Sequence, residues 1–191
     1  MADRPQITLM MNNDILETPS RYGLTAIVLH WLVALLIGAA FALGVVMVEI
    51  PGLTPTKLRY FSWHKWLGVT VLALAALRLL WRLWRGVPPS VDMPRWQQQA
   101  SVIGHALLYA LMFAVPLSGY FYSLAAGVPV VYFGVWPLPV LMEADPVLKP
   151  VLKQLHIALV YTMLVIIAVH LLAALKHHLI DRDGVLKRML P

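Results

Sequence analysis

The chain has 191 residues, of which 60% are hydrophobic and 13% are charged, with a formal net charge of +6 and no cysteine. A soluble domain carries about 25% charged residues, so this composition indicates a membrane protein. The absence of cysteine excludes disulfides, thiolate zinc sites and iron–sulfur clusters. The basic residues stand singly at the ends of apolar runs. This pattern disfavours nucleic-acid binding and favours the flanks of membrane spans.

Four apolar runs are long enough to cross a bilayer, which takes about 20 residues. In chain order they cover about residues 23–48, 63–84, 102–124 and 155–175. In the second run, Lys65 and Arg78 must extend their side chains toward opposite surfaces. The sequence therefore predicts an all-α transmembrane four-helix bundle, with residues 1–191 forming a single membrane domain.

The stretch between the last two spans needs a separate interpretation. Residues 123–142 are uncharged and about as long as a span, but they contain three prolines and two glycines. Lipid cannot replace the hydrogen bonds that proline removes from a helix. We interpret residues 125–152 as an interfacial loop that can include a short helix. Tyr132, Phe133 and Trp136 suit that depth.

The charged flanks predict the orientation of the bundle. With four spans, ten basic residues lie on the side of the termini and five on the other side, so the sequence predicts cytoplasmic N- and C-termini. The ten are Arg4, Arg21, Arg78, Arg82, Arg85, Arg95, Lys176, Arg182, Lys187 and Arg188; the five are Lys57, Arg59, Lys65, Lys149 and Lys153.

Two histidines lie in the apolar last span, His156 and His170. Fourteen residues at 100° each bring them within about 40° of one helix face, about 21 Å apart along the axis. Ionisable residues inside spans are rare and usually functional. The alternative is that each imidazole only hydrogen-bonds a neighbouring helix.

Histidines of two other spans match this pair in depth. His30 lies about two turns into the first span, at the level of His170, and His64 begins the second span, at the level of His156. Haem iron takes one axial imidazole on each face, so two layers of two histidines predict two bis-histidine haems. Zinc is the competing ligand, but it prefers four donors.

Small and basic residues near these layers each have two interpretations. Gly68, Gly38 and Gly44 leave room for a flat macrocycle, although small residues also serve ordinary helix packing in membranes. Arg78 and Arg82, at the cytoplasmic end of the second span, can pair with haem propionates. The alternative is that they only anchor the helix end at the membrane surface.

A further histidine follows the last span. His177 lies seven residues beyond His170, within about 20° of the same face and about 10 Å nearer the cytoplasm. One interpretation places it beside the inner haem, as a hydrogen-bond donor or proton partner for a quinone carbonyl. The other is that His177 and His178 are a solvated interfacial pair.

Several segments together resemble the bacterial cytochrome b561 family. They are "RYGLTAIVLHWLVALL", "WHKWLG", "GHALLYALMFAVPLSGY", "VPVVYFG" and "KHHLIDRDGVLKRMLP", in order from Arg21 onward. The resemblance implies two b-type haems, with His30 and His170 as ligands of the cytoplasmic haem and His64 and His156 as ligands of the outer one.

His105 is the rival ligand, because it lies near the start of the third span at the level of the cytoplasmic haem. The resemblance favours His30, so we interpret His105 as a hydrogen-bonding neighbour of that site, with ligation as the alternative. The family's quinone pocket uses a small polar residue two positions before the first ligand. Here that position is Val28, and Thr25, about one turn earlier, is the available substitute.

The resemblance also implies a function and a location. Family members are associated with superoxide oxidation coupled to ubiquinone reduction in the bacterial inner membrane, which would place the loop 125–152 in the periplasm. We therefore expect an oxidoreductase that moves electrons from a small anionic donor such as superoxide to ubiquinone. The five outer basic residues would attract such an anion, or would only anchor helix ends. The alternative functions are the cytochrome b anchor subunit of a larger membrane dehydrogenase or hydrogenase, and a structural or metal-binding membrane protein.

Overall fold

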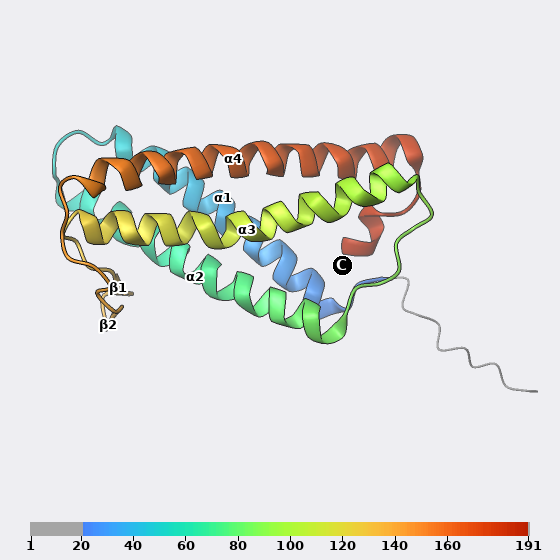
Figure 1. The fold of residues 1–191 in the computed structure, drawn as a ribbon, viewed down its shortest axis with the longest axis horizontal. Coiled ribbons are helices and arrows are strands. Elements are labelled where there is room, and N and C mark those ends of the chain that lie inside the picture. The colour runs from blue at the N-terminus through green and yellow to red at the C-terminus, as the bar shows by residue number, and fades with distance from the viewer. Residues whose placement is uncertain (1–20, 191) are drawn as a thin grey trace, which may run out of the picture.

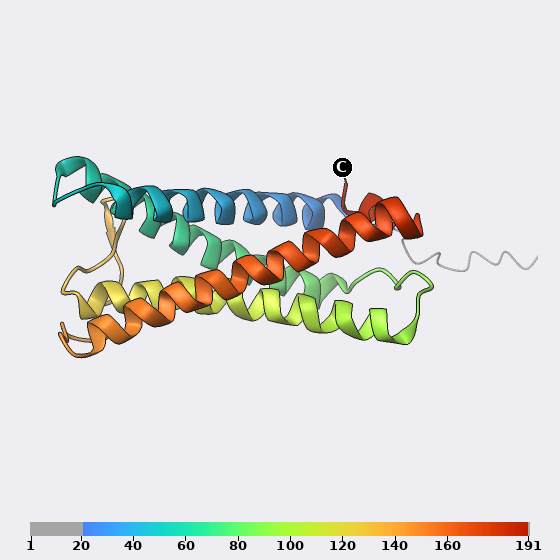
Figure 2. The ribbon, with the colours of Figure 1, turned by 90° about the horizontal axis from the view of Figure 1, so that it is seen from above.

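The computed structural model describes residues 21–190, and four long helices dominate it (Figure 1). They are α1 (Leu24–Glu49), α2 (Pro55–Arg85), α3 (Arg95–Ala125) and α4 (Leu148–Lys176). All four helices are long and apolar enough to cross a membrane. Successive helices run in opposite directions, and α4 crosses the others obliquely (Figure 2). The predicted all-α four-helix bundle is confirmed.

Helices α2 and α4 begin before their apolar runs, at residues whose side chains hold the first turn. Thr54 accepts a hydrogen bond from the backbone N–H of Lys57 at 3.1 Å, and Pro55 occupies the first helical position of α2, where proline is favoured. Asp145 Oδ1 accepts from the N–H groups of Val147 and Leu148 at 2.8 and 2.9 Å at the start of α4. Both helices therefore begin several residues before their apolar runs.

The bundle has two distinct ends. At the termini end lie the start of α1, the connection between α2 and α3, and the C-terminal segment (Figure 1). At the hairpin end lie the connections from α1 to α2 and from α3 to α4. The predicted division of basic residues follows these two ends, apart from Arg4, which lies outside the described residues. Which end faces the cytoplasm stays a prediction from charge.

The loop before α4 contains a small β-hairpin and no short helix. Strands β1 (Val131–Tyr132) and β2 (Trp136–Pro137) pair antiparallel. The tight turn between them uses the left-handed region at Phe133 (φ 51°) and Gly134 (φ 73°), which glycine adopts at no steric cost. Of the three prolines that argued against a fifth span, Pro137 lies in β2, and Pro129 and Pro139 flank the hairpin.

The core of the bundle lies between the two ends. Side chains of all four helices form it: Val33, Ala75, Leu111, Met112 and Met163. Met163 is seven residues from both His156 and His170, which is about 10 Å along the axis in each direction. An apolar layer therefore separates the two predicted histidine layers.

The C-terminal segment folds back across the termini end (Figure 1). One π-helical turn, η1 (His177–Asp181), follows α4, and a 3₁₀ turn, η2 (Leu186–Met189), follows it. The chain reverses at Arg182, with φ 54°. This segment is held against the start of α1, because Trp31 Nε1 donates to the Met189 carbonyl at 2.7 Å and Arg21 Nη2 donates to the Leu190 carbonyl at 2.5 Å.

Candidate haem sites

The first histidine pair joins α1 and α4 near the termini end. The ring centroids of His30 and His170 are 6.3 Å apart, and the ring planes make an angle of 61°. The two residues are 140 positions apart in sequence, and the depth argument from the sequence placed them together. The structure brings them side by side.

The second pair joins α2 and α4 near the hairpin end. The ring centroids of His64 and His156 are 6.2 Å apart, at an interplanar angle of 89°. Both pairs therefore have nearly the same spacing, and each takes one histidine from α4.

This spacing fits a metal held between two imidazoles. A metal–imidazole bond is about 2.0–2.1 Å long, and a further ~1.1 Å reaches the ring centroid, so two imidazoles on opposite sides of one metal have centroids about 6.3 Å apart. Haem iron with two axial histidines has this arrangement. The ring spacing of both pairs fits the group.

The hydrogen bonds of the second pair also leave the correct nitrogen for a metal. His64 Nδ1 is 2.9 Å from the Ala40 carbonyl, and a carbonyl only accepts, so Nδ1 carries the proton. His156 Nδ1 is 3.1 Å from the Val115 carbonyl and 3.0 Å from Ser118 Oγ. Ser118 gives its own proton to Val115 O at 2.8 Å and can therefore accept from the ring. Both imidazoles keep an unprotonated Nε2, the form that binds metals.

Glycines make the room that these rings occupy. A Cβ atom at Gly119 would lie 3.0 Å from His156 Cε1, and one at Gly44 would lie 3.3 Å from His64 Cε1. Gly44 thus accommodates a ring, whereas a Cβ at Gly68 or Gly38 would meet no described atom within 4 Å. The open space beside Gly68 and Gly38 is compatible with the predicted macrocycle.

The sequence interpretation overlooked Ser118 and Gly119. Both follow Pro116, which removes one N–H from the ladder of α3. A Pro-Leu-Ser-Gly sequence inside a lipid-embedded helix is unusual because it combines a helix breaker with two small residues. This local pattern in the sequence could have indicated a functional site in α3.

The first pair has a different environment, because Arg78 Nη2 lies 2.9 Å from His30 Nδ1. The guanidinium groups of Arg78 and Arg82 also lie over the Tyr109 ring, 5.4 and 5.9 Å from its centroid. A guanidinium can only donate hydrogen bonds, so in this contact His30 Nδ1 accepts and Nε2 carries the proton. Ligation of a metal through His30 Nε2 would require the proton to move to Nδ1 and Arg78 to turn away from the ring. Both predicted propionate partners therefore lie on the side of the bundle that holds His30, and their pairing with propionates stays a prediction.

His105 lies in the same layer as the first pair. Its ring centroid is 5.5 Å from that of His170, and its Nδ1 is 3.3 Å from Ser101 Oγ. A distance of 5.5 Å is shorter than the ~6.3 Å that an intervening metal requires. The geometry thus favours edge packing of His105 against His170, in keeping with its interpretation as a neighbour of the site.

His177 is paired with carboxylates at the end of α4. Its Nδ1 is 2.5 Å from Asp183 Oδ2 and 3.2 Å from Asp181 Oδ2, whereas His178 is exposed. Burial opposes ionisation of Asp183, but the Val185 N–H and the His177 imidazole outweigh it and hold the pKa of the Asp183 carboxyl below its ordinary value. The sequence interpretation overlooked Asp183, since only the fold-back of the chain brings it to His177.

The hairpin is attached to α2 near the second pair. Trp66 Nε1 donates to the Val131 carbonyl at 2.8 Å, and the Thr70 and Tyr132 hydroxyls are 2.8 Å apart. The Phe133 ring lies 5.2 Å from that of Trp66. These contacts hold the hairpin over the part of α2 that carries Gly68.

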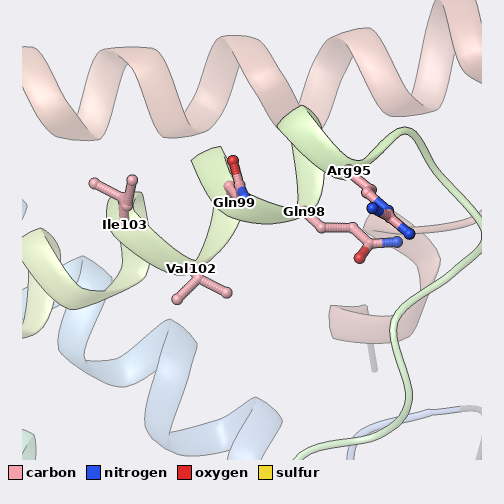
Figure 3. A pocket seen from close by; sticks show the side chains of 5 residues that line it. All are labelled: Arg95, Gln98, Gln99, Val102 and Ile103. Carbon is pink, nitrogen blue, oxygen red and sulfur yellow. The ribbon is translucent and has the colours of Figure 1, made fainter.

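A surface depression of ≈ 480 Å³ lies on the first turns of α3 (Figure 3). Arg95, Gln98, Gln99, Val102 and Ile103 line it. The lining changes from polar to apolar along the helix, as expected for a surface at the edge of a membrane.

Comparison with known proteins decides the family. The family model described as prokaryotic cytochrome b561 matches residues 21–191. The chain belongs to this family. It is 35% identical to "Cytochrome b561 homolog 2" of Escherichia coli K12 over 177 residues, which is 91% of this chain and 93% of that protein.

Two further relatives cover similar lengths. "Probable superoxide oxidase CybB" of Yersinia pestis is 31% identical over 90% of this chain and 96% of its own, and "Cytochrome b561 homolog 1" of Escherichia coli K12 is 29% identical over 90% and 98%. The chain is therefore a b-type haem-binding bacterial membrane protein of electron transfer.

Proposed function

We propose that this cytochrome b561 carries electrons across the bacterial inner membrane, from superoxide on the periplasmic side to ubiquinone on the cytoplasmic side. It would use two b haems, one between His30 and His170 and one between His64 and His156. The observation that carries the proposal is the presence of two histidine pairs with bis-imidazole spacing, one at each end of the bundle.

The protein side of the mechanism is ligation, spacing and exclusion of water. When bound, haem supplies reversible one-electron chemistry, which no amino-acid side chain of these sites provides. The four histidines would hold the iron atoms, and the apolar layer around Met163 would keep the two sites apart in a dry interior. Arg78 and Arg82 are the proposed partners of the propionates at the termini end.

Superoxide is the proposed donor for two reasons. One relative bears the name of a probable superoxide oxidase. Five basic residues lie at the hairpin end, partly offset by Glu49, Glu143 and Asp145. A positive rim concentrates a small anion and speeds its capture, and this effect weakens as salt rises. The hairpin held on Trp66 would limit access to small molecules.

Ubiquinone is the proposed acceptor at the termini end, next to His177. Two superoxide ions deliver two electrons, and two protons complete the reduction, so two superoxide, one quinone and two protons give two oxygen molecules and one quinol. The paired His177 and Asp183 side chains are the available proton partners for the quinone carbonyls. The protons would then come from the cytoplasm, in keeping with the predicted cytoplasmic termini.

The test uses the purified protein in lipid vesicles, with superoxide and a short-chain ubiquinone. We expect superoxide-dependent quinol formation that is lost in His64→Ala and strongly slowed in His177→Ala, with His178→Ala as the matched control at wild-type rate. A His177→Ala protein with both haems and the wild-type rate would remove the proposed quinone site. If the haems accept electrons only when a second protein is supplied, the chain is instead the cytochrome b anchor subunit of a larger dehydrogenase or hydrogenase.

A further inference from the structure

We infer that the side chains and carbonyls around the two histidine pairs set different redox potentials, so that the His30–His170 site is the easier one to reduce. This inference rests on the proposed function, because it assumes one haem at each pair. A difference in potential of this sign gives a thermodynamic reason for the proposed flow of electrons from the hairpin end to the termini end.

The His64–His156 pair is surrounded by groups that favour oxidised iron. Both Nδ1 atoms face hydrogen-bond acceptors, the Ala40 carbonyl for His64 and the Val115 carbonyl with Ser118 Oγ for His156. An imidazole whose Nδ1–H is held by an acceptor is a more basic ligand through Nε2. A more basic ligand stabilises ferric iron over ferrous iron, which lowers the potential.

The His30–His170 pair lacks such acceptors. When His30 ligates through Nε2, its Nδ1 carries the proton, and the nearest group, the Arg78 guanidinium, has no atom that could accept it. Within residues 21–190, the structure gives no hydrogen bond to the His170 imidazole. The ligands of this site are therefore less basic than those of the other pair.

Charge acts in the same direction. The guanidinium groups of Arg78 and Arg82 lie together over Tyr109, and Arg78 also contacts the first ligand ring. A nearby positive charge favours the state that has gained an electron, and it acts strongly in a site removed from water. Propionates that pair with these arginines would offset part of this charge. Removing an arginine would then leave the charge of the propionate uncompensated. The loss of Arg78 therefore lowers the potential of this site with or without a propionate partner.

The chain offers a matched control on the same helix. Arg85 lies seven residues after Arg78 in α2, about two turns along nearly the same face. Its guanidinium lies over the rings of Trp81 and Trp84, 5.6 and 5.4 Å from their centroids. It carries the same charge as Arg78 but lies about 10 Å farther along the helix, beyond the histidine layer.

The experiment is a redox titration followed by visible spectra. His30→Ala and His64→Ala first assign each spectral component to its pair. We expect the higher midpoint potential to belong to the component lost in His30→Ala. Arg78→Gln should lower this midpoint by about 59 mV, equivalent to a tenfold fall in the ratio of reduced to oxidised haem at fixed potential for a one-electron couple. Arg78→Lys should keep most of the wild-type value, and Arg85→Gln should change neither midpoint.

The outcomes separate this inference from the proposed function. A reversed order of the two midpoints, or an Arg78→Gln protein with the wild-type midpoint, would overturn the inference while leaving two haems in place. If Arg78→Gln loses its haem, Arg82→Gln tests the same charge effect with Arg78 in place. A titration with one haem component, or spectra that no histidine replacement changes, would overturn the proposed function itself.

Discussion

Replacing Gly119 by alanine tests the second histidine pair without touching a ligand. An ideal Cβ at this position would lie 3.0 Å from His156 Cε1, 3.2 Å from Nδ1 and 3.6 Å from Nε2. Carbon atoms in ordinary contact are about 3.5–4.0 Å apart. The imidazole must therefore move by several tenths of an ångström, away from the Val115 and Ser118 acceptors that orient it.

The expected cost follows from this overlap. Forcing one extra carbon into a packed site typically costs about 1–3 kcal/mol. Since about 1.4 kcal/mol is a factor of ten in affinity, haem affinity at the His64–His156 site should fall roughly 5- to 140-fold. Alanine is a better helix former than glycine by about 1 kcal/mol, so a general weakening of α3 does not explain such a loss.

The assay is haem titration of the purified variant, with reduced spectra recorded at each step. Gly119→Ala should retain the haem of the His30–His170 pair and lose or weaken the other. Gly104→Ala is the matched control, because it makes the same change in α3 at a position where a Cβ meets no described atom within 4 Å. Full occupancy by two haems with the wild-type spectrum in Gly119→Ala would refute the assignment of His156 to a haem site.

Four further single variants test the contacts that close the two ends. Trp31→Phe removes the indole N–H that holds the C-terminal segment, so limited proteolysis of that segment should be faster at unchanged haem content. Thr70→Val and Tyr132→Phe each break the same hydrogen bond; each should cost about 0.5–1.5 kcal/mol of stability, and the double variant should cost little more than either alone. The pKa of Asp183 lies below its ordinary value of 3.8 in the folded chain, so its contribution is present above that pH and is lost as pH falls through the folded value. As the pH falls through this value, pepsin should therefore cleave the C-terminal segment of the wild-type chain faster. Asp183→Asn should not show this acid step, because its contact with His177 is already weakened at neutral pH.

The sequence predicted the parts of the fold that depend on lipid and on helix periodicity. The four spans follow from hydropathy, and the depth of each histidine follows from the alternating direction of the spans. That reasoning brings His30 to His170 and His64 to His156, and the ring spacings in the structure agree with this pairing. Their role as ligands stays a prediction.

The remaining features depend on contacts between distant segments, which periodicity does not report. The hairpin was predicted only as a loop, because its form depends on left-handed backbone at Phe133 and Gly134 and on docking against Trp66. Asp183 reaches His177 only through the reversal at Arg182. These contacts complete the surroundings of both sites.

The identity of the residue that faces His170 shows the same limit. Depth alone offered both His30 and His105 at this level, and only ring geometry separates them. One ring centroid lies 6.3 Å away and the other 5.5 Å away, and the longer distance is the one that leaves room for a metal. No spacing along the sequence could distinguish the two.

The most direct test of the account is the ratio of haem to protein, with the haem type, in the purified wild-type chain and in His30→Ala and His64→Ala. The account predicts two non-covalent b haems per chain in the wild type, because two histidine pairs are present and the chain has no cysteine to attach haem. It predicts one haem in each variant, with a different spectral component remaining. A wild-type chain with a single haem, or two variants that lose the same component, would contradict it.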